Sequence, residues 1–483
     1  MTLTNILVFI VLALLGGFLA GPFSEKGRRW RGWFILLAGV FSLYWLQPAL
    51  PIRNLDFWLP TASLALVLLG WGVTRPKDAP LVKTDLAAGG ALLAVALLIG
   101  LLRYMGPLCC VTPTNPPVAA EVVIGLLVVL LLAGLVARFA PSRRVGLGVG
   151  VVLVLVLFLV LKTEYFSLVA SQFLRLLAGQ KAELAKASDL SWLGFSYIAF
   201  RLLHTLRERQ TGRLPALGLP EYAGYVLFFP ALTAGPIDRA ERFIKDWRSL
   251  PADRWSNIAE GARRILLGLF RKFVLADLLA LVALSQVNFA QVTNTFWLWL
   301  LLYAYAFRIY FDFSGYTDIA IGLGRLMGFK LPENFDRPYL KPNLTTFWNS
   351  WHITLAQWFR AYYFNPLTRA LRSRKQPWPM WAIILVGQVT TFALIGLWHG
   401  VTWNFLIWGA WHGVGLFIHN RWLEFSRQRL PSSEKGPAWV KVTLAWLGTF
   451  LTFNYVALGW VWFALPLPSQ SWQVLLRLFG VTS

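Results

Sequence analysis

Apolar stretches of about 17 to 20 residues recur from one end of the chain to the other, each long enough to cross ~30 Å of hydrocarbon as a helix. Short polar connections separate them. The pattern predicts an all-α, polytopic integral membrane protein. The expected spans are residues 3–20, 33–50, 57–73, 86–103, 118–137, 145–161, 190–205, 264–284, 295–320, 380–398, 401–420 and 439–465.

Basic residues are concentrated in alternate connections of the first half. Residues 24–31, 75–83 and 138–144 are rich in Lys and Arg, whereas residues 104–120 contain neither. Basic loops stay on the cytoplasmic side of a membrane. We therefore expect the N-terminus and residues 104–120 to lie outside.

Two segments of the second half fit this pattern less simply. The apolar piece 222–234 is short, ends in Gly235 and Pro236 and has Arg-rich sequence on both sides, so we expect it to be re-entrant. Residues 330–375 are polar, basic and rich in Trp, which favours the cytoplasmic face. Composition alone favours an interfacial amphipathic helix here, with Trp348, Trp351, Trp358 and Phe359 as anchoring aromatics and arginines that meet anionic lipid headgroups.

Composition supports a membrane protein and excludes several other classes. The chain has 483 residues, of which 57% are hydrophobic and only 14% charged. Its net charge of +23 would suggest nucleic acid in a soluble protein, but in a membrane protein it indicates cytoplasmic loops, and we expect no nucleic-acid partner. The two cysteines, Cys109 and Cys110, are too few for a disulfide framework, an iron–sulfur cluster or a zinc site.

His399 is the first candidate for chemistry. It lies between two apolar runs and between two glycines, at membrane depth or its edge. An ionisable residue at that depth is a functional candidate, because burying it unpaired costs several kcal/mol. A helix-packing histidine is an equally good interpretation of this position alone. His352 follows Trp351, and membrane anchoring is the simpler reading there.

The other three histidines give weaker signals. His412 and His419 are seven residues apart and have no third ligand nearby, so a metal site is not expected. Both are interpreted as packing or helix-end residues. His204 is interpreted as a residue at the cytoplasmic end of a helix, between Arg201 and Arg207.

Two carboxylates within one expected span need cationic partners. Asp312 and Asp318 are six residues apart, and Arg308 and Arg325 can supply the charges locally. We favour a structural ion-pair cluster over a catalytic one.

Several separated motifs of the second half together resemble the membrane-bound O-acyltransferase (MBOAT) family, in its bacterial branch. The resemblance covers roughly residues 190–465. The motifs are at residues 193–201, 229–239, 311–322, 331–339, 347–360 and 396–400.

The resemblance implies a ring of helices around a thin core, with a tunnel from the cytoplasm to an outer funnel. By position, His399 matches the catalytic histidine of the family and His352 the second active-site histidine. Acyl transfer to a hydroxyl needs a base and oxyanion stabilisation. We assign the base to His399, and expect His352 to orient the donor or to stabilise the oxyanion. The expected substrate-binding residues are Asn349, Trp351, Trp398, Tyr316 and Arg360.

The branch includes alginate O-acetyltransferases and teichoic acid D-alanyltransferases. The resemblance therefore implies transfer of an acetyl or D-alanyl group to hydroxyls of an extracytoplasmic polysaccharide or teichoic acid, in the bacterial cytoplasmic membrane. The implied co-substrate is a thioester, acetyl-CoA or an acylated carrier protein, and no permanently bound cofactor is expected. The implied partners are this donor, the polymer or an accessory acyltransferase protein, and membrane lipid.

The sequence departs from the family pattern at Ala361, where Asp is usual, and at residues 367–374, which replace a Gly-Gly-Asn stretch of the acetylating members. Residues 235–239 lean toward the D-alanylating group, so the acyl group stays open. We expect about six spans in residues 1–189, a catalytic core in 190–465 and an amphipathic tail in 466–483.

A transporter or flippase of an acyl carrier or lipid is the competing class. Such proteins commonly contain inverted repeats. No paired broken segments occur in the two halves of this chain, and the His and Trp motifs occur once. A membrane enzyme is therefore favoured, with an envelope-assembly scaffold third.

The charge pattern generates a test of topology. Cys109 and Cys110 lie in the connection expected outside, so a membrane-impermeant maleimide should label them in intact cells. Cells with opened membranes give the full labelling level as the control. Labelling that appears only after the inner face is opened would mean that the topology is inverted.

Overall fold

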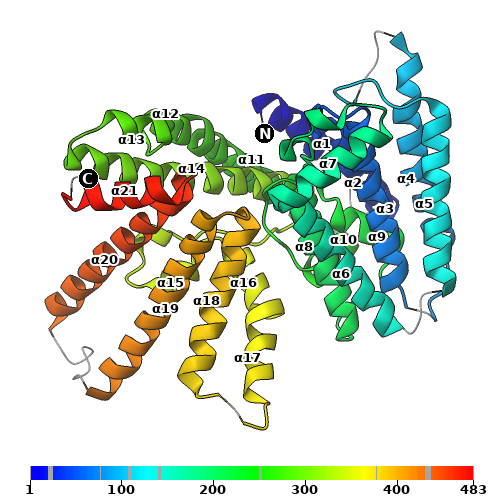
Figure 1. Ribbon diagram of the computed structural model, residues 1–483. Coiled ribbons are helices and arrows are strands. Elements are labelled where there is room, and N and C mark those ends of the chain that lie inside the picture. Colours follow the sequence, from blue (N-terminus) through cyan, green and yellow to red (C-terminus); the bar gives the residue numbers. More distant parts are fainter. Residues whose placement is uncertain are drawn as a thin grey trace. The chain divides into compact units, whose positions relative to one another are not determined.

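The computed structural model describes residues 2–19, 25–76, 78–106, 111–139, 143–249, 253–376, 378–429 and 437–481. These residues are helical and contain no strand, which confirms the all-α prediction. The chain forms two compact units (Figure 1). Unit 1 comprises Met1–Ile265 with Ile319–Pro332, and unit 2 comprises Leu266–Asp318 with Glu333–Ser483. Cys109 and Cys110 lie outside the described residues.

Unit 1 consists of the N-terminal helices and the end of one long helix, α14. Its helices are α1 Leu3–Leu19, α2 Glu25–Leu46, α3 Leu55–Thr74, α4 Lys83–Leu101, α5 Ala119–Phe139, α6 Arg143–Lys162, α7 Glu164–Leu177, α8 Phe195–Gln210, α9 Leu219–Val226, α10 Ala240–Arg248 and most of α11 Arg254–Leu269.

Unit 2 begins where α11 ends. Its helices are the π-helix η6 Phe270–Ala276, α12 Asp277–Val282, α13 Gln286–Gln291, most of α14 Thr295–Leu326, α15 Leu344–Trp348, α16 Ile353–Phe359, the π-helix η8 Arg360–Phe364, α17 Asn365–Arg372, α18 Met380–His399, α19 Trp403–Arg429, α20 Ala438–Ala464 and α21 Pro468–Leu478.

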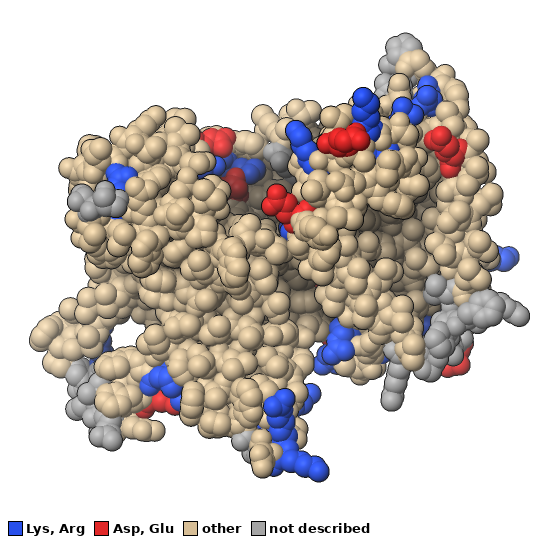
Figure 2. All heavy atoms as spheres, viewed as in Figure 1, with Lys and Arg blue, Asp and Glu red and all other residues tan. Residues whose placement is uncertain are grey.

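The described helices make the chain a multi-pass membrane protein. Five of them are long and apolar enough to span a bilayer, namely those at Leu55–Thr74, Lys83–Tyr104, Val145–Lys162, Met380–His399 and Ala438–Ala464. Leu131 on α5 and Val149 on α6 are about 60% exposed, as lipid-facing side chains are (62% and 61%). Figure 2 shows few charged side chains along α5.

The helix expected at residues 190–205 differs from its prediction. α8 starts at Phe195, has 16 residues and is polar on average. Its Arg201 and His204 are buried inside unit 1. A helix that is enclosed by protein can carry such residues, because neighbouring groups satisfy them.

The segment predicted to be re-entrant is broken and buried in unit 1. α9 has only eight residues, too few to cross a bilayer, and a short turn at Phe229–Ala231 follows it. Arg201 of α8 donates hydrogen bonds to the carbonyls of Val226 and Ala231, both at 2.8 Å. The buried guanidinium therefore satisfies backbone groups that the helix break sets free.

A second buried arginine serves another helix end in unit 1. Arg31 of α2 is 1% exposed and donates to the carbonyls of Asp246, Trp247 and Ser249, at 2.8 to 2.9 Å. These carbonyls belong to the end of α10, where backbone acceptors lack partners within the helix. The guanidinium also lies 5.2 Å from the centre of the Phe329 ring.

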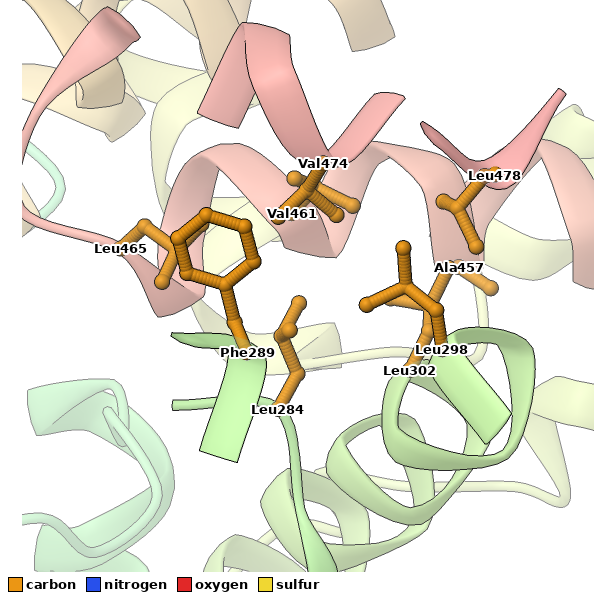
Figure 3. Close-up of a cluster of buried hydrophobic side chains, with 9 residues drawn as sticks. All are labelled: Leu284, Phe289, Leu298, Leu302, Ala457, Val461, Leu465, Val474 and Leu478. Atoms are coloured by element: carbon orange, nitrogen blue, oxygen red, sulfur yellow. The ribbon is translucent and has the colours of Figure 1, made fainter. Parts of the chain in front are cut away.

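Aliphatic packing in unit 2 joins α14, α20 and α21 (Figure 3). Val474 and Leu478 of α21 lie in this cluster, so the amphipathic tail packs on unit 2 through its apolar face. The buried members are Leu284, Phe289, Leu298, Leu302, Ala457, Val461, Leu465, Val474 and Leu478.

The polar segment 330–375 does not form the single interfacial helix that composition favours. It is divided into α15, α16, η8 and α17, and a short antiparallel bridge pairs Phe335 with Trp351. Trp348, Trp351 and Phe359 are 7%, 4% and 7% exposed. Most of the expected anchoring aromatics are thus core residues, because the segment folds back on itself.

Replacement of Arg31 by Met should destabilise unit 1. The variant leaves several carbonyls without a donor, so we expect a loss of about 2 to 5 kcal/mol. The measurement is thermal unfolding of purified protein in detergent.

Arg29→Met is the matched control, because Arg29 is exposed on the same helix. It should stay within about 0.5 kcal/mol of the parent. Equal effects of the two substitutions would contradict the structural role of Arg31.

Candidate active site

Close packing of α18 against α19 sets the position of His399. A Cβ atom on Gly396 would lie 2.1 Å from the carbonyl oxygen of Phe405, and one on Gly409 would lie 2.4 Å from that of Phe392. Small residues let membrane helices approach this closely. His399 is the last residue of α18, so this contact fixes the site at the turn between the two helices.

Aromatic rings surround the His399 imidazole. Its centroid lies 4.5 Å from that of Trp398, 4.9 Å from Phe463, 5.8 Å from Trp408 and 6.0 Å from Phe405. The residue is half-buried. The ring is therefore confined by its neighbours while part of it stays accessible.

His352 is held by the backbone around Asn334. The amide of Ile353 donates to the carbonyl of Asn334 at 3.0 Å, and the Thr354 hydroxyl donates to the Asn334 side-chain oxygen at 2.6 Å. Asn334 is fully buried. His352 itself has φ 44° and ψ 53°, a left-handed conformation that is uncommon for a residue with a side chain. Tertiary contacts thus over-determine the orientation of its imidazole.

The His352 ring is buried and has no hydrogen-bond partner among the described residues. Its centroid lies 4.6 Å from Phe313 and 6.2 Å from Trp398. Burial, together with the nearby His399, lowers the pKa of His352 well below its usual value. The imidazole is therefore neutral at pH 7, with one nitrogen able to donate and the other able to accept.

The structure brings His352, His399 and Trp398 together, since both imidazoles contact the same indole. Asn349 and Arg360 form a separate exposed pair, in which the Arg360 guanidinium donates to the Asn349 carboxamide at 2.8 Å. Arg360 begins the π-helix η8, a type of element often found at functional sites.

Trp351 and Tyr316 lie deeper in unit 2. Trp351 is 4% exposed, and its ring lies 5.1 Å from Trp460 and 5.2 Å from Phe335. Tyr316 is 6% exposed on α14. Both are therefore core residues of unit 2 and are not exposed to solvent.

Other buried polar atoms of unit 2 also lack a protein partner within the described chain. Native proteins leave few such atoms unpaired, so these groups are available to a polar ligand or to water. They include the indole nitrogens of Trp348 and Trp408, the hydroxyls of Ser314 and Thr317, and both ring nitrogens of His412.

The carboxylates of α14 pair with a neighbouring segment. Asp318 pairs with Arg271, and Asp312 pairs with Lys272, both on η6. The prediction that Arg308 and Arg325 are the partners is wrong. A Cβ on Gly315 would lie 2.8 Å from the Gly268 carbonyl, so the two backbones approach closely enough to bring η6 onto the carboxylates.

The remaining histidines have structural surroundings. His412 is fully buried, 4.9 Å from Trp348 and 5.0 Å from Trp408. His419 lies 3.1 Å from the Thr345 hydroxyl.

His204 is not at a helix end, as the sequence suggested, but is buried in α8. Its Nε2 accepts the backbone N–H of Ala240, the first residue of α10, at 3.0 Å. No three His, Cys, Asp or Glu side chains in the described part of the chain lie close enough to hold a metal ion.

Sequence reasoning missed three residues of this site. Asn334 and Phe313 lie within motifs that were recognised, yet neither was assigned a role. Trp408 contacts both His399 and His412. The available signal was a Trp that follows His399 by nine residues on the next apolar helix.

A family comparison agrees with the motifs. A model of MBOAT, the membrane-bound O-acyltransferase family, matches residues 149–458, which are more than half of the chain. The chain belongs to this family and is an O-acyltransferase. The match begins near the start of α6, earlier than the expected position near residue 190.

Similar proteins include enzymes named for three different polymers. A teichoic acid D-alanyltransferase of Streptococcus thermophilus is 36% identical over 288 residues, or 57% of this chain and 69% of the relative. A peptidoglycan O-acetyltransferase of Helicobacter pylori is 33% identical over 57% and 52% of the two chains. A probable alginate O-acetylase, AlgI, of Pseudomonas aeruginosa is 35% identical over 60% and 51%.

Gly409→Ala should disturb the site through the contact between α18 and α19. The added methyl group meets the Phe392 carbonyl, so we expect a loss of about 1 to 3 kcal/mol and lower acyl transfer. Thermal unfolding and transfer of a labelled acyl group are the measurements.

Gly148→Ala in α6 is the control, because nothing lies within 4 Å of the added Cβ. It should change stability by no more than about 1 kcal/mol. A Gly409→Ala protein as stable and active as this control would contradict the packing argument.

Proposed function

We propose that this protein transfers an acetyl or D-alanyl group from a cytoplasmic thioester donor to hydroxyls of an extracytoplasmic polysaccharide or teichoic acid. The observation that carries the proposal is the meeting of His399 and His352 at Trp398 in a chain of this family. The membrane is the bacterial cytoplasmic membrane, and a tunnel through the ring of helices connects donor and acceptor.

His399 acts as the general base. The acceptor hydroxyl attacks the thioester carbonyl while the His399 imidazole takes the hydroxyl proton. The tetrahedral intermediate then collapses, the carbon–sulfur bond breaks, and the thiol leaves with the proton. Partial exposure of His399 supports this role, because the base must reach a hydroxyl on the incoming polymer.

His352 stabilises the oxyanion or orients the donor. A neutral imidazole held rigidly in a buried position can donate one N–H to developing negative charge without reorganisation. The fixed backbone around Asn334 supports this role. Trp398 spaces the two imidazoles, while Asn349, Arg360, Trp351 and Tyr316 bind substrate or shape its pocket.

Direct transfer is favoured over a cysteine acyl-enzyme. Cys109 and Cys110 are the only cysteines, and they precede the family match at residues 149–458. No thiol nucleophile is therefore available within the matched region.

The donor and acceptor follow from the class of reaction and from the relatives. The donor is acetyl-CoA or an acylated carrier protein at the cytoplasmic face, and an accessory acyltransferase protein can complete delivery to the polymer. The relatives are named for teichoic acid, peptidoglycan and alginate. Parallel assays with labelled acetyl and D-alanyl donors distinguish the two acyl groups, and a protein that incorporates neither would contradict the proposal.

His399→Ala should lower transfer per folded molecule by about 10² to 10⁴, because it removes the base, and should leave donor binding nearly unchanged. The measurement is incorporation of a labelled acyl group, with thermal stability matched to the parent.

His419→Ala is the control and should retain most activity per folded molecule. If His399→Ala kept near-full turnover, the assignment of the base would fail.

A further inference from the structure

One end of unit 1 carries a polar pocket of about 460 Å³. The loop after α2 contributes Arg53 and Asn54, the end of α4 contributes Arg103, and the start of α5 contributes Glu121. This pocket lies in residues 50–121, outside the family match. No residue with a proposed catalytic or substrate-binding role lines this pocket.

The pocket has a fixed frame. Arg103 donates from one terminal nitrogen to the Pro116 carbonyl at 2.6 Å, and the backbone N–H of Arg53 donates to the Gln180 carboxamide at 3.0 Å. Asp56 holds the opposite wall, because its carboxylate accepts the hydroxyl and backbone N–H of Thr114.

A second pocket, of about 210 Å³, lies at the same end of unit 1. Lys162 at the end of α6 lines it, together with Ser191 and Ser196. The Lys162 ammonium lies 5.9 Å from the centre of the Phe158 ring. A cation and two hydroxyl groups therefore converge on a cavity large enough for a phosphate or carboxylate.

One hydrophobic cluster joins the walls of the two pockets. Ile52 lines the first pocket, Leu190 lines the second, and both belong to a buried cluster with Leu55 and Leu59. Gln180 strengthens this connection by donating to the Pro51 carbonyl at 3.1 Å. The pockets are therefore neighbours on one surface.

The pockets contain three basic residues, Arg53, Arg103 and Lys162, at the end of unit 1 that is expected to lie outside the membrane. Arg53, Arg103 and Lys162 form no ion pair with any described residue. The charge rule places this end outside, where basic residues are normally depleted. In Figure 2, Lys and Arg side chains gather at the upper end of α4 and α5, beside Asp and Glu side chains.

We propose that these two pockets bind successive anionic groups of the acceptor polymer and hold it at the outer surface of unit 1. The guanidinium and ammonium groups suit phosphate or carboxylate, while Asn54, Glu121 and the serines suit hydroxyls of the same polymer. This inference rests on the proposed function, because it assigns the acceptor as an anionic, hydroxyl-bearing polymer. Anionic lipid headgroups share this chemistry, and the test distinguishes lipid binding from polymer binding.

The test measures binding of two fluorescent oligomers, a glycerol phosphate oligomer and an alginate oligosaccharide, to the full chain in phosphatidylcholine nanodiscs. The variants are Arg53→Gln with Arg103→Gln, and Lys162→Gln. Exposed ion pairs are each worth a factor of about two to five, so the double variant should weaken binding of one oligomer about tenfold. The KM for that polymer should rise while kcat stays unchanged.

Lys83→Gln is the matched control, because Lys83 is an exposed cation of unit 1 in the connection expected on the cytoplasmic side. It should bind the oligomer as the parent does. Equal binding by the parent and the double variant would overturn the proposal. It would also be overturned if the variants lost only the thermal stabilisation given by added phosphatidylglycerol, because the site would then bind lipid.

The experiment distinguishes a failure of the polymer-binding proposal from a failure of the proposed function. If the parent protein binds the oligomer through these cations but transfers no acyl group, the polymer-binding proposal stands and the proposed function is contradicted. If the double variant transfers the acyl group normally at an unchanged KM, the proposed function stands and the polymer-binding proposal is contradicted.

Discussion

The break after α9 and the end of α10 both depend on a buried arginine that donates to the backbone carbonyls exposed there. Hydrocarbon offers no hydrogen bonds, so a carbonyl without a partner costs several kcal/mol. Arg201 supplies donors to the break between α9 and the following turn, and Arg31 supplies them to the end of α10. Both belong to unit 1. In unit 2, Asn334 has the converse role, because its oxygens accept the backbone N–H of Ile353 and the hydroxyl of Thr354 beside His352.

Close helix packing sets the surroundings of His399 at the end of an apolar helix. Glycines let α18 and α19 approach closely, and aromatic rings then fill the space around His399. The rings restrict the imidazole. His352 is positioned differently, by backbone pairing in a polar segment, and its ring nitrogens form no hydrogen bond to described residues. Both imidazoles are thus held in place by their surroundings, and that of His352 keeps both ring nitrogens available for hydrogen bonds to a substrate.

The charged groups divide according to their surroundings. In unit 2, the buried Asp318 pairs with Arg271 of η6, because an unpaired buried carboxylate would be costly, and the exposed Asp312 pairs with Lys272 of the same element. At one end of unit 1, Arg53, Arg103 and Lys162 form no ion pair with described residues and line two pockets. Water can solvate the exposed Arg53 and Arg103, and the half-buried Lys162 faces its pocket, so all three can bind an anion.

The sequence by itself determined the helical class and the family, because span length and local motifs depend on neighbouring residues. It also singled out His352 and His399, which stay a proposal, and indicated that residues 222–234 are too short to span the membrane. It did not determine the partners of Asp312 and Asp318, the buried setting of His204 or the core positions of Trp348 and Trp351. Only the tertiary structure decided these, because each depends on how closely two backbones distant in sequence approach, and that distance is set by packing.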